Sequence, residues 1–168
     1  MTLSKLNALS SRDAVTLFRQ CCGSLPWSRQ MEAERPFRDL AHLHEVAGSV
    51  WAGLPHAMWR EAFAHHPKIG DMDSLRKRFP ATAPWAEREQ SGAATSSDAV
   101  LRSLESGNAL YEAKFGYLFI ICATGKSAEE MLAHLNERLS NFPEDEIRIA
   151  GREQAAITAL RLEKLLQD

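Results

Sequence analysis

Cysteine is scarce in this sequence, and its spacing argues against a disulfide framework. Among 168 residues there are three cysteines: Cys21 and Cys22 are adjacent, and Cys122 lies within an apolar stretch. An odd number of cysteines without a C-x-x-C motif is not typical of disulfide-stabilised proteins. We therefore expect reduced cysteines that are mostly structural, with a nucleophilic role for one of them as the alternative.

The sequence also lacks long apolar runs and an excess of one charge. Twenty basic and 22 acidic residues leave a net charge of −2, so no basic surface for nucleic acid or a membrane is expected. No apolar run approaches the ~20 residues that cross a bilayer. Residues 1–7 lack the apolar core of a secretory signal. These features predict a cytoplasmic protein that binds neither nucleic acid nor membrane.

Recognisable metal, phosphate and nucleophile motifs are absent as well. His44 and Glu45 begin like a zincin motif, but Gly48 stands where the second histidine would be needed. His65 and His66 are adjacent, so their side chains diverge on a helix. A zinc site assembled from scattered ligands stays an alternative. The spacing itself predicts no bound metal and no cofactor.

What the sequence does have is helical periodicity along almost its whole length. Caps, glycines, prolines and apolar spacings predict helices over about 10–22, 37–53, 55–66, 97–116, 127–139 and 144–166. Ser127 and Glu130 form a capping-box pattern at the start of the fifth helix. We expect an all-α fold: a single domain over residues 1–168 that is a bundle of roughly seven to eight helices.

Two stretches do not follow this periodicity. Residues 67–96 contain three prolines and a Ser/Thr/Ala-rich tail. A connection of that length within a compact domain is usually functional or disordered. Residues 117–123 form an apolar run that looks like a buried strand but has no partner segment. We expect a buried helix end or an extended core segment there.

His66 is the first candidate for a functional side chain. Pro67 disfavours helical geometry at the residue before it, so the helix that begins near Pro55 should end at His66. At about 100° per residue, His66 shares a face with Trp59 and Phe63, which directs it inward. By itself this position is consistent with an interaction with its own helix dipole, or with a catalytic or binding role.

Arg161 is the second candidate. In the last predicted helix, Gln154 and Arg161 share the core-facing stripe with Ile147, Ala150, Ile157 and Leu165. Both the arginine and the glutamine need partners on such a stripe, because an unpaired buried polar group or charge is costly. The partner of Arg161 is either a protein carboxylate in a structural ion pair or an anionic ligand, which the planar guanidinium fits well. The two candidates suggest an imidazole and a guanidinium that converge.

Five segments resemble, in order and spacing, the 2-oxo-4-hydroxy-4-carboxy-5-ureidoimidazoline (OHCU) decarboxylases. They are His66–Gly70, Glu89–Gly92, Lys114–Glu129, Arg138–Asn141 and Leu160–Leu162, and the similarity runs from about Ser4 to Leu165. The resemblance implies an all-α homodimer that takes part in urate breakdown. It also implies conversion of OHCU to (S)-allantoin and carbon dioxide without cofactor or metal.

The resemblance further implies roles for individual residues. His66 matches the family's catalytic histidine, and Glu89 matches the Glu of its Ser-x-x-Glu-Gln substrate-binding motif. We expect Glu89 to be catalytic as well, by orienting His66, or to bind ureido and hydroxyl groups of the substrate. The positions that match substrate-binding residues are Pro67, Gln90, Phe119, Ile120, Ile121, Cys122, Ala123 and Arg161. Ala86 departs from the family's Ser-x-x-Glu-Gln motif. The hydrogen bond of that serine is therefore absent here, or water or a neighbouring group supplies it.

The residue types fit the chemistry. Loss of carbon dioxide needs a sink for the electron pair that stays behind, and the substrate's own ring C=N supplies one without pyridoxal or thiamine. We expect His66 to transfer protons, because the ordinary histidine pKa lies near working pH. Two other classes stay open: a metal-dependent hydrolase of a related ureido or cyclic amide compound, and a helical interaction module without enzymatic activity.

Overall fold

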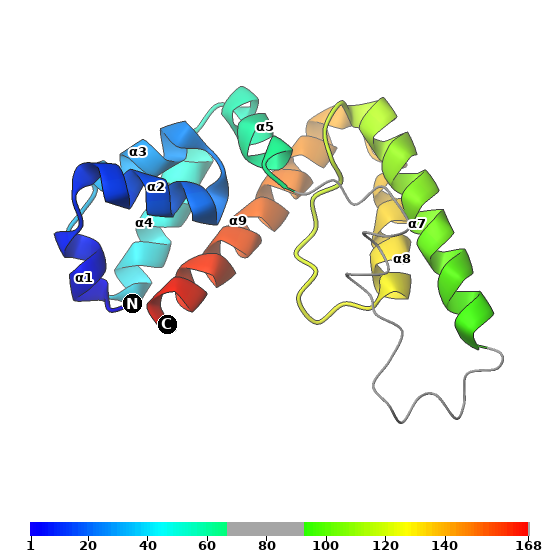
Figure 1. Ribbon diagram of the computed structural model, residues 1–168. Coiled ribbons are helices and arrows are strands. Elements are labelled where there is room, and N and C mark those ends of the chain that lie inside the picture. The colour runs from blue at the N-terminus through cyan, green and yellow to red at the C-terminus, as the bar shows by residue number, and fades with distance from the viewer. Residues whose placement is uncertain (67–92, 168) are drawn as a thin grey trace. The chain divides into compact units, whose positions relative to one another are not determined.

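Eight α-helices make up the part of the chain that the structure describes, residues 1–66 and 93–167 (Figure 1). In this computed structural model they are α1 (Leu3–Ala8), α2 (Ser11–Cys22), α3 (Leu25–Ala33), α4 (Leu40–Gly53), α5 (His56–Ala64), α7 (Ala93–Phe115), α8 (Ala128–Arg138) and α9 (Pro143–Gln167). The described residues form no strand, and the predicted all-α class is confirmed. The chain divides into two compact units, residues 1–66 with 147–168 and residues 67–146.

The first unit contains the five N-terminal helices and most of α9. The helices α1 to α4 each begin at a side chain that accepts a hydrogen bond from a backbone N–H of the first turn: Thr2, Ser10, Ser24 and Asp39. The start and end of α2 agree with the helix predicted over about 10–22. The helices α1 and α3 were not predicted. Pro26 lies in the first turn of α3, where a backbone N–H would have no partner within the helix, so its absence in proline costs no hydrogen bond.

The start of α4 differs from the sequence prediction by three residues. Asp39 accepts from His42 N at 2.7 Å and caps the helix, whereas the N–H of Phe37 donates to Asn7 Oδ1 at 2.9 Å. Phe37 is buried beside Phe18, with ring centroids 6.1 Å apart. Phe37 therefore serves as a core anchor ahead of the helix, because its backbone and its ring are bound to α1 and α2.

The close approach of α5 to α9 depends on a glycine. A methyl group on Gly151 would lie 2.5 Å from Trp59 Cζ3. The Trp59 ring stacks on Trp51 at a centroid distance of 5.2 Å, and the indole N–H of Trp51 donates to Gly151 O at 2.9 Å. This packing brings the end of α5 to the middle of α9.

The end of α2 meets the end of α5 at a second glycine. Gly23 has a φ of 85°, a left-handed conformation that favours glycine at a helix C-terminus. A methyl group there would also lie 2.5 Å from His65 Cβ. The ends of α2 and α5 and the middle of α9 thus come together within one unit.

The second unit is built on the pairing of α7 with α8. These two helices lie side by side in Figure 1, and a methyl group on Gly107 would lie 2.6 Å from Leu135 Cδ2. The helix α7 begins at Ala93, so the prediction that irregular structure extends to residue 96 is wrong for its last four residues. Residues 117–123 have no helical structure, with Tyr117, Ile120 and Ile121 buried. They form a core segment, and the alternative of a helix end is wrong.

The remaining predicted bounds agree closely with the structure. The capping box of Ser127 and Glu130 is present at the start of α8, and α9 spans Pro143–Gln167 against the predicted 144–166. None of the described helices has the length and apolar composition that crossing a membrane requires.

Candidate active site

His66 lies just past the end of α5, on the core-facing side of that helix. The backbone N–H groups of His65 and His66 donate to Ala62 O (3.1 Å) and Phe63 O (3.2 Å) and close the last turn. Trp59, Ala62 and Phe63 are buried. His66 is half-buried and His65 is exposed. The predicted inward direction of His66 is confirmed, as is the divergence of the two histidines.

The imidazole of His66 meets a buried amide from α9. Its Nε2 lies 2.6 Å from Gln154 Oε1, and Gln154 is 0% exposed. The Gln154 Nε2 donates to Thr158 Oγ1 at 3.3 Å, and the Thr158 hydroxyl donates to the backbone oxygen of Gln154 at 3.0 Å. Gln154, which needed partners on the core-facing stripe, finds them in His66 and Thr158.

Arg161 lies two turns further along α9 on nearly the same face. Seven residues correspond to about 10 Å along a helix axis. The Nη1 of Arg161 donates to Cys21 O at 3.0 Å, in the last turn of α2, where a cation is favourable. Among the residues whose side chains are described, no ion pair joins Arg161 to a carboxylate. Its protein partner there is a neutral carbonyl, so the structural ion pair is not seen in this part of the chain.

Cys21 and Cys22 are buried thiols at the same end of α2. Burial raises the pKa of each to about 11, and the Arg161 guanidinium opposes that effect. Cys22 also hydrogen-bonds to the Thr158 side chain. Both cysteines are free, as predicted. A thiol with so high a pKa is a poor nucleophile at neutral pH, which favours the structural role.

In the second unit, two cations hold the backbone of the predicted substrate-contacting segment Phe119–Ala123. The Nη1 of Arg138 donates to Ile120 O at 2.8 Å. The Nζ of Lys126 donates to Cys122 O at 2.8 Å. These bonds fix two alternate carbonyls of a segment that has no regular secondary structure of its own.

Arg138 belongs to a buried charged cluster whose role was not predicted. Its Nε donates to Glu146 Oε1 at 2.8 Å, and the Asn141 Nδ2 donates to Glu146 Oε2 at 2.8 Å. Tyr111 also hydrogen-bonds to Glu146, and burial together with this bond raises the pKa of Tyr111 well above its usual range. A signal was available, because Arg138 follows Leu135 by three residues on the apolar face of α8.

The other predicted site residues, Pro67, Glu89 and Gln90, lie outside the described residues, as does Ala86. In the first unit, Gln154 and Arg161 lie on nearly the same face of α9, and His66 is bonded to Gln154. In the second unit, cationic side chains fix the backbone of Phe119–Ala123. Among the described residues, no group of three or more histidine, cysteine or acidic side chains is arranged to hold a metal ion.

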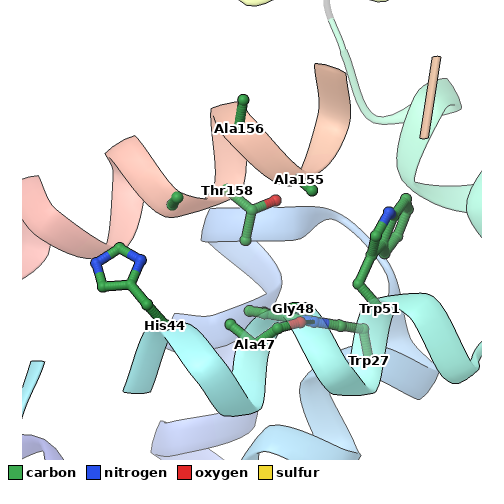
Figure 2. Close-up of a pocket in the computed structure, with 9 residues that line it drawn as sticks. Trp27, His44, Ala47, Gly48, Trp51, Ala155, Ala156 and Thr158 are labelled. Atoms are coloured by element: carbon green, nitrogen blue, oxygen red, sulfur yellow. Dashed lines mark hydrogen bonds between the residues drawn. The ribbon is translucent and has the colours of Figure 1, made fainter. Parts of the chain in front are cut away.

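A hollow of about 290 Å³ also lies in the first unit, between α4 and α9 (Figure 2). Its lining is mostly small or aromatic: Trp27, His44, Ala47, Gly48, Trp51, Ala155, Ala156, Thr158 and Ala159. The indole N–H groups of the two tryptophans donate to backbone carbonyls. The hollow includes Thr158 but neither His66 nor Arg161, so it is not the predicted site.

Known proteins similar to this chain are enzymes of uric acid degradation. The family model described as OHCU decarboxylase matches residues 7–163. The Arabidopsis thaliana "Uric acid degradation bifunctional protein TTL" is 36% identical over 152 residues, which are 90% of this chain and 47% of that protein. The chain thus spans about half the length of that relative. The 2-oxo-4-hydroxy-4-carboxy-5-ureidoimidazoline decarboxylase of Amia calva is 29% identical over 168 residues, 99% of this chain and 95% of that protein.

Solved structures agree with these matches. A crystal structure of OHCU decarboxylase in the presence of (S)-allantoin has a TM-score of 0.73 and 36% identity, covering 90% of this chain and 97% of that one. A crystal structure of (S)-allantoin synthase, 16% identical with a TM-score of 0.70, covers 98% of this chain and 54% of that one, and shows a shared fold. Because the family model spans nearly the whole chain, the protein belongs to the OHCU decarboxylase family.

Proposed function

We propose that this protein decarboxylates OHCU to (S)-allantoin and carbon dioxide in the breakdown of urate. The observation that carries the proposal is the placement of His66 in a member of this family. The histidine that the family resemblance marks as catalytic faces inward and its ring is bound to a buried amide. A structure of a 36% identical decarboxylase in the presence of (S)-allantoin supports this product.

The net reaction replaces a carboxylate with a proton. When the bond to the carboxyl carbon breaks, its electron pair moves toward the adjacent ring C=N, and the ring takes up one proton as carbon dioxide leaves. Because the substrate contains this electron sink, the proposed reaction needs neither a cofactor nor a metal. The protein supplies orientation and proton transfer, and His66 is the group we assign to proton transfer.

The remaining residues bind the substrate in this proposal. Arg161 holds an anionic oxygen, for which its planar donors are suited. Glu89 orients His66 or binds ureido and hydroxyl groups, and Gln90 adds neutral hydrogen bonds. The family resemblance also assigns substrate contacts to Pro67 and to the backbone of Phe119–Ala123.

We also propose that the protein is a cytoplasmic homodimer, with residues 1–168 as one domain and a small molecule as its ligand. The family resemblance supports the dimer, and a net charge of −2 gives no reason to expect nucleic acid as a partner. Light scattering on the purified protein would give twice the chain mass of 18.8 kDa. A mass of one chain would contradict the dimer.

Replacement of His66 tests the proposed function directly. We expect His66→Asn to lower the turnover of freshly generated OHCU by roughly 10²-fold or more, as loss of a positioned acid–base group does. Turnover is followed by the decay of substrate absorbance and by the optical activity of allantoin. The matched control is His65→Ala, which alters an exposed neighbouring histidine and should leave turnover nearly unchanged.

The same assay separates the alternatives. Equal losses in the two histidine variants would indicate a shared structural or metal role. Activity that disappears on dialysis against a chelator, and returns only with added zinc or manganese, would favour the hydrolase. An absence of turnover in the wild-type protein would favour the helical interaction module without enzymatic activity.

A further inference from the structure

We propose that two cations of the second unit, Arg138 and Lys126, are positioning residues for the backbone of the segment Phe119–Ala123. Each cation holds the carbonyl oxygen of one peptide group, and the N–H of that same peptide group is thereby aimed at the substrate. The inference rests on the proposed function, because the family resemblance assigns substrate contacts to this segment. The contacts that carry it lie within the second unit.

The first step is the direction of the Ile121 N–H. In a trans peptide group the C=O and the following N–H lie in one plane and point in opposite directions. The peptide bond between Ile120 and Ile121 is trans. Because the Ile120 oxygen accepts from Arg138 Nη1 at 2.8 Å, the N–H of Ile121 points away from the guanidinium.

Lys126 repeats this arrangement two residues further along the chain. Its Nζ donates to Cys122 O at 2.8 Å, so the N–H of Ala123 points away from the ammonium group. The side chain can reach back because residues 123–126 form a turn, in which Lys126 N donates to Ala123 O at 3.1 Å. Gly125 has a φ of 76° in this turn, a conformation that glycine adopts without strain. The N–H groups of Ile121 and Ala123, the paired donors, are therefore each directed by a cation.

The second step is the acceptor for the paired donors. Among the residues that the structure describes, neither N–H is hydrogen-bonded to the protein. Ile121 is buried, and an N–H that is buried without an acceptor is costly. A carbonyl oxygen of the substrate supplies an acceptor, and the ureido group has such an oxygen, which allantoin retains. The cation on each carbonyl also polarises the peptide group, which strengthens its N–H as a donor.

The third step is the rigid placement of Arg138. Both Arg138 and Glu146 are buried, and the carboxylate balances the charge of the guanidinium. The Nε of Arg138 donates to Glu146 Oε1 at 2.8 Å. The guanidinium carbon lies 4.6 Å from the centroid of the Phe119 ring, which is a cation–π distance. Held in this way, Arg138 keeps the Ile120 carbonyl in one direction with a further N–H group.

The experiment compares two lysines that donate to backbone carbonyls in the second unit. Lys126→Met removes the donor to Cys122 O. Lys114→Met is the matched control, because Lys114 Nζ donates to Leu139 O at 2.7 Å and to Asn141 O at 2.9 Å, outside the segment. We expect Lys126→Met to weaken the binding of (S)-allantoin, measured by calorimetry, roughly three- to tenfold, the range that one hydrogen bond supplies. Lys114→Met should leave the affinity unchanged.

Amide NMR of the ¹⁵N-labelled protein separates positioning from a purely structural role. In the wild type, saturating (S)-allantoin should move the proton signals of the paired donors downfield, as a new hydrogen bond does. The N–H of Lys126, which already donates to Ala123 O, should move little and is the internal control. Lys126→Met should weaken the response of Ala123. Lys126→Arg, which keeps a cationic donor, should restore both this response and the affinity.

Arg138 is tested by the double substitution Arg138→Met/Glu146→Gln, which removes both charges so that no unpaired carboxylate is buried. The response of the Ile121 N–H to (S)-allantoin should weaken, while that of Ala123 stays. If this variant does not fold, the wild-type titration still decides, because an Ile121 N–H that does not respond contradicts the direction assigned to it.

The outcomes are distinguishable from a failure of the proposed function. Normal turnover of OHCU, with paired donors whose signals do not respond to (S)-allantoin, overturns the inference alone. Equal losses of affinity in Lys126→Met and Lys114→Met also overturn it, because they would indicate a general loss of packing in the second unit. An absence of turnover in the wild type removes the proposed function, and it overturns the inference as well, because the paired donors then have no substrate to bind.

Discussion

The guanidinium of Arg161 has a neutral partner in the described part of the protein, the Cys21 carbonyl oxygen 3.0 Å away. Loss of that bond exposes no buried opposite charge, unlike the truncation of a buried ion pair. We therefore expect Arg161→Lys and Arg161→Ala to melt within a few degrees of the wild type. Their substrate affinity should fall, because a lysine lacks the bidentate fork and truncation of a charged pair with a ligand costs on the order of 2–5 kcal/mol.

Thermal melting and saturation kinetics on the same preparations check this. The control is Arg152→Ala, because Arg152 is exposed on α9 and should change neither quantity. An Arg161→Ala variant that binds substrate normally would remove this residue from the site. A large drop in melting temperature without substrate would indicate a structural charge pair instead.

At the level of single residues, helical periodicity was sufficient to find polar side chains on apolar faces. It placed His66 on an inward face and identified Gln154 and Arg161 as groups in need of partners, and each of the three has one in the structure. It did not identify the partners. The Cys21 carbonyl comes within reach of Arg161 only through the packing of α2 on α9. Thr158 lies four residues from Gln154 on the same helix, but nothing in the sequence marked it as the partner.

At the level of elements, local signals fixed some helix ends well, although the side-chain caps at Thr2, Ser24 and Asp39 were not recognised. The Ser10 cap, the Gly23 terminus and the capping box at Ser127 were all readable in the sequence. The misses have a common cause. The short helices α1 and α3 are stabilised by tertiary packing more than by local pattern, through Leu6, which is 0% exposed, and through Trp27, whose indole donates to Ala47 O.

The close packing of α5 on α9, which brings His66 to Gln154, can be tested by a substitution at Gly151. We expect Gly151→Ala to destabilise the protein by about 1–3 kcal/mol, because the new methyl overpacks against Trp59; the ring atom it would meet is 2.5 Å away. The displacement of α5 from α9 should also lower turnover. Denaturant unfolding and turnover together measure both effects.

The matched control is Gly48→Ala in α4, where nothing lies within 4 Å of the added methyl. That substitution should stabilise the protein by up to about 1 kcal/mol, since alanine favours the helix over glycine. If the two variants changed stability equally, the close packing of α5 on α9 would not be the cause of the loss.

For the whole molecule, composition and periodicity predicted the all-α class, but not the long-range pairing that builds the site. His66 and Gln154 are 88 residues apart in the chain. Their meeting depends on the stacking of Trp51 on Trp59 and on the N–H of Trp51 that donates to Gly151 O. In sequence these residues are ordinary helix positions. Order and spacing of motifs, compared with a known family, singled out His66 and Arg161 but not the pairing of His66 with Gln154.

The pH dependence of global stability offers a test of the buried α2 terminus. Burial raises the pKa values of Cys21 and Cys22 to about 11 in the folded protein, from 9.0 for an ordinary cysteine thiol. Between these values the unfolded thiols lose protons that the folded ones keep, so stability must fall as pH rises. Their contribution is fully present below pH 9 and is lost as pH approaches 11. A shift of this size corresponds to up to about 2–3 kcal/mol for each thiol.

Denaturant unfolding at several values between pH 8 and pH 11 measures the slope, with Cys21→Ala/Cys22→Ser as the matched variant. Baseline stability will differ, because both side chains are buried, but only the change with pH matters. Tyr111 also has a raised pKa and contributes a further fall above its ordinary pKa of about 10; it does so in both proteins and cancels in the difference. The variant should therefore lose less stability than the wild type between pH 9 and pH 11. Parallel slopes would show that the two thiols are not the buried, protonated groups that the structure places beside Arg161 and Thr158.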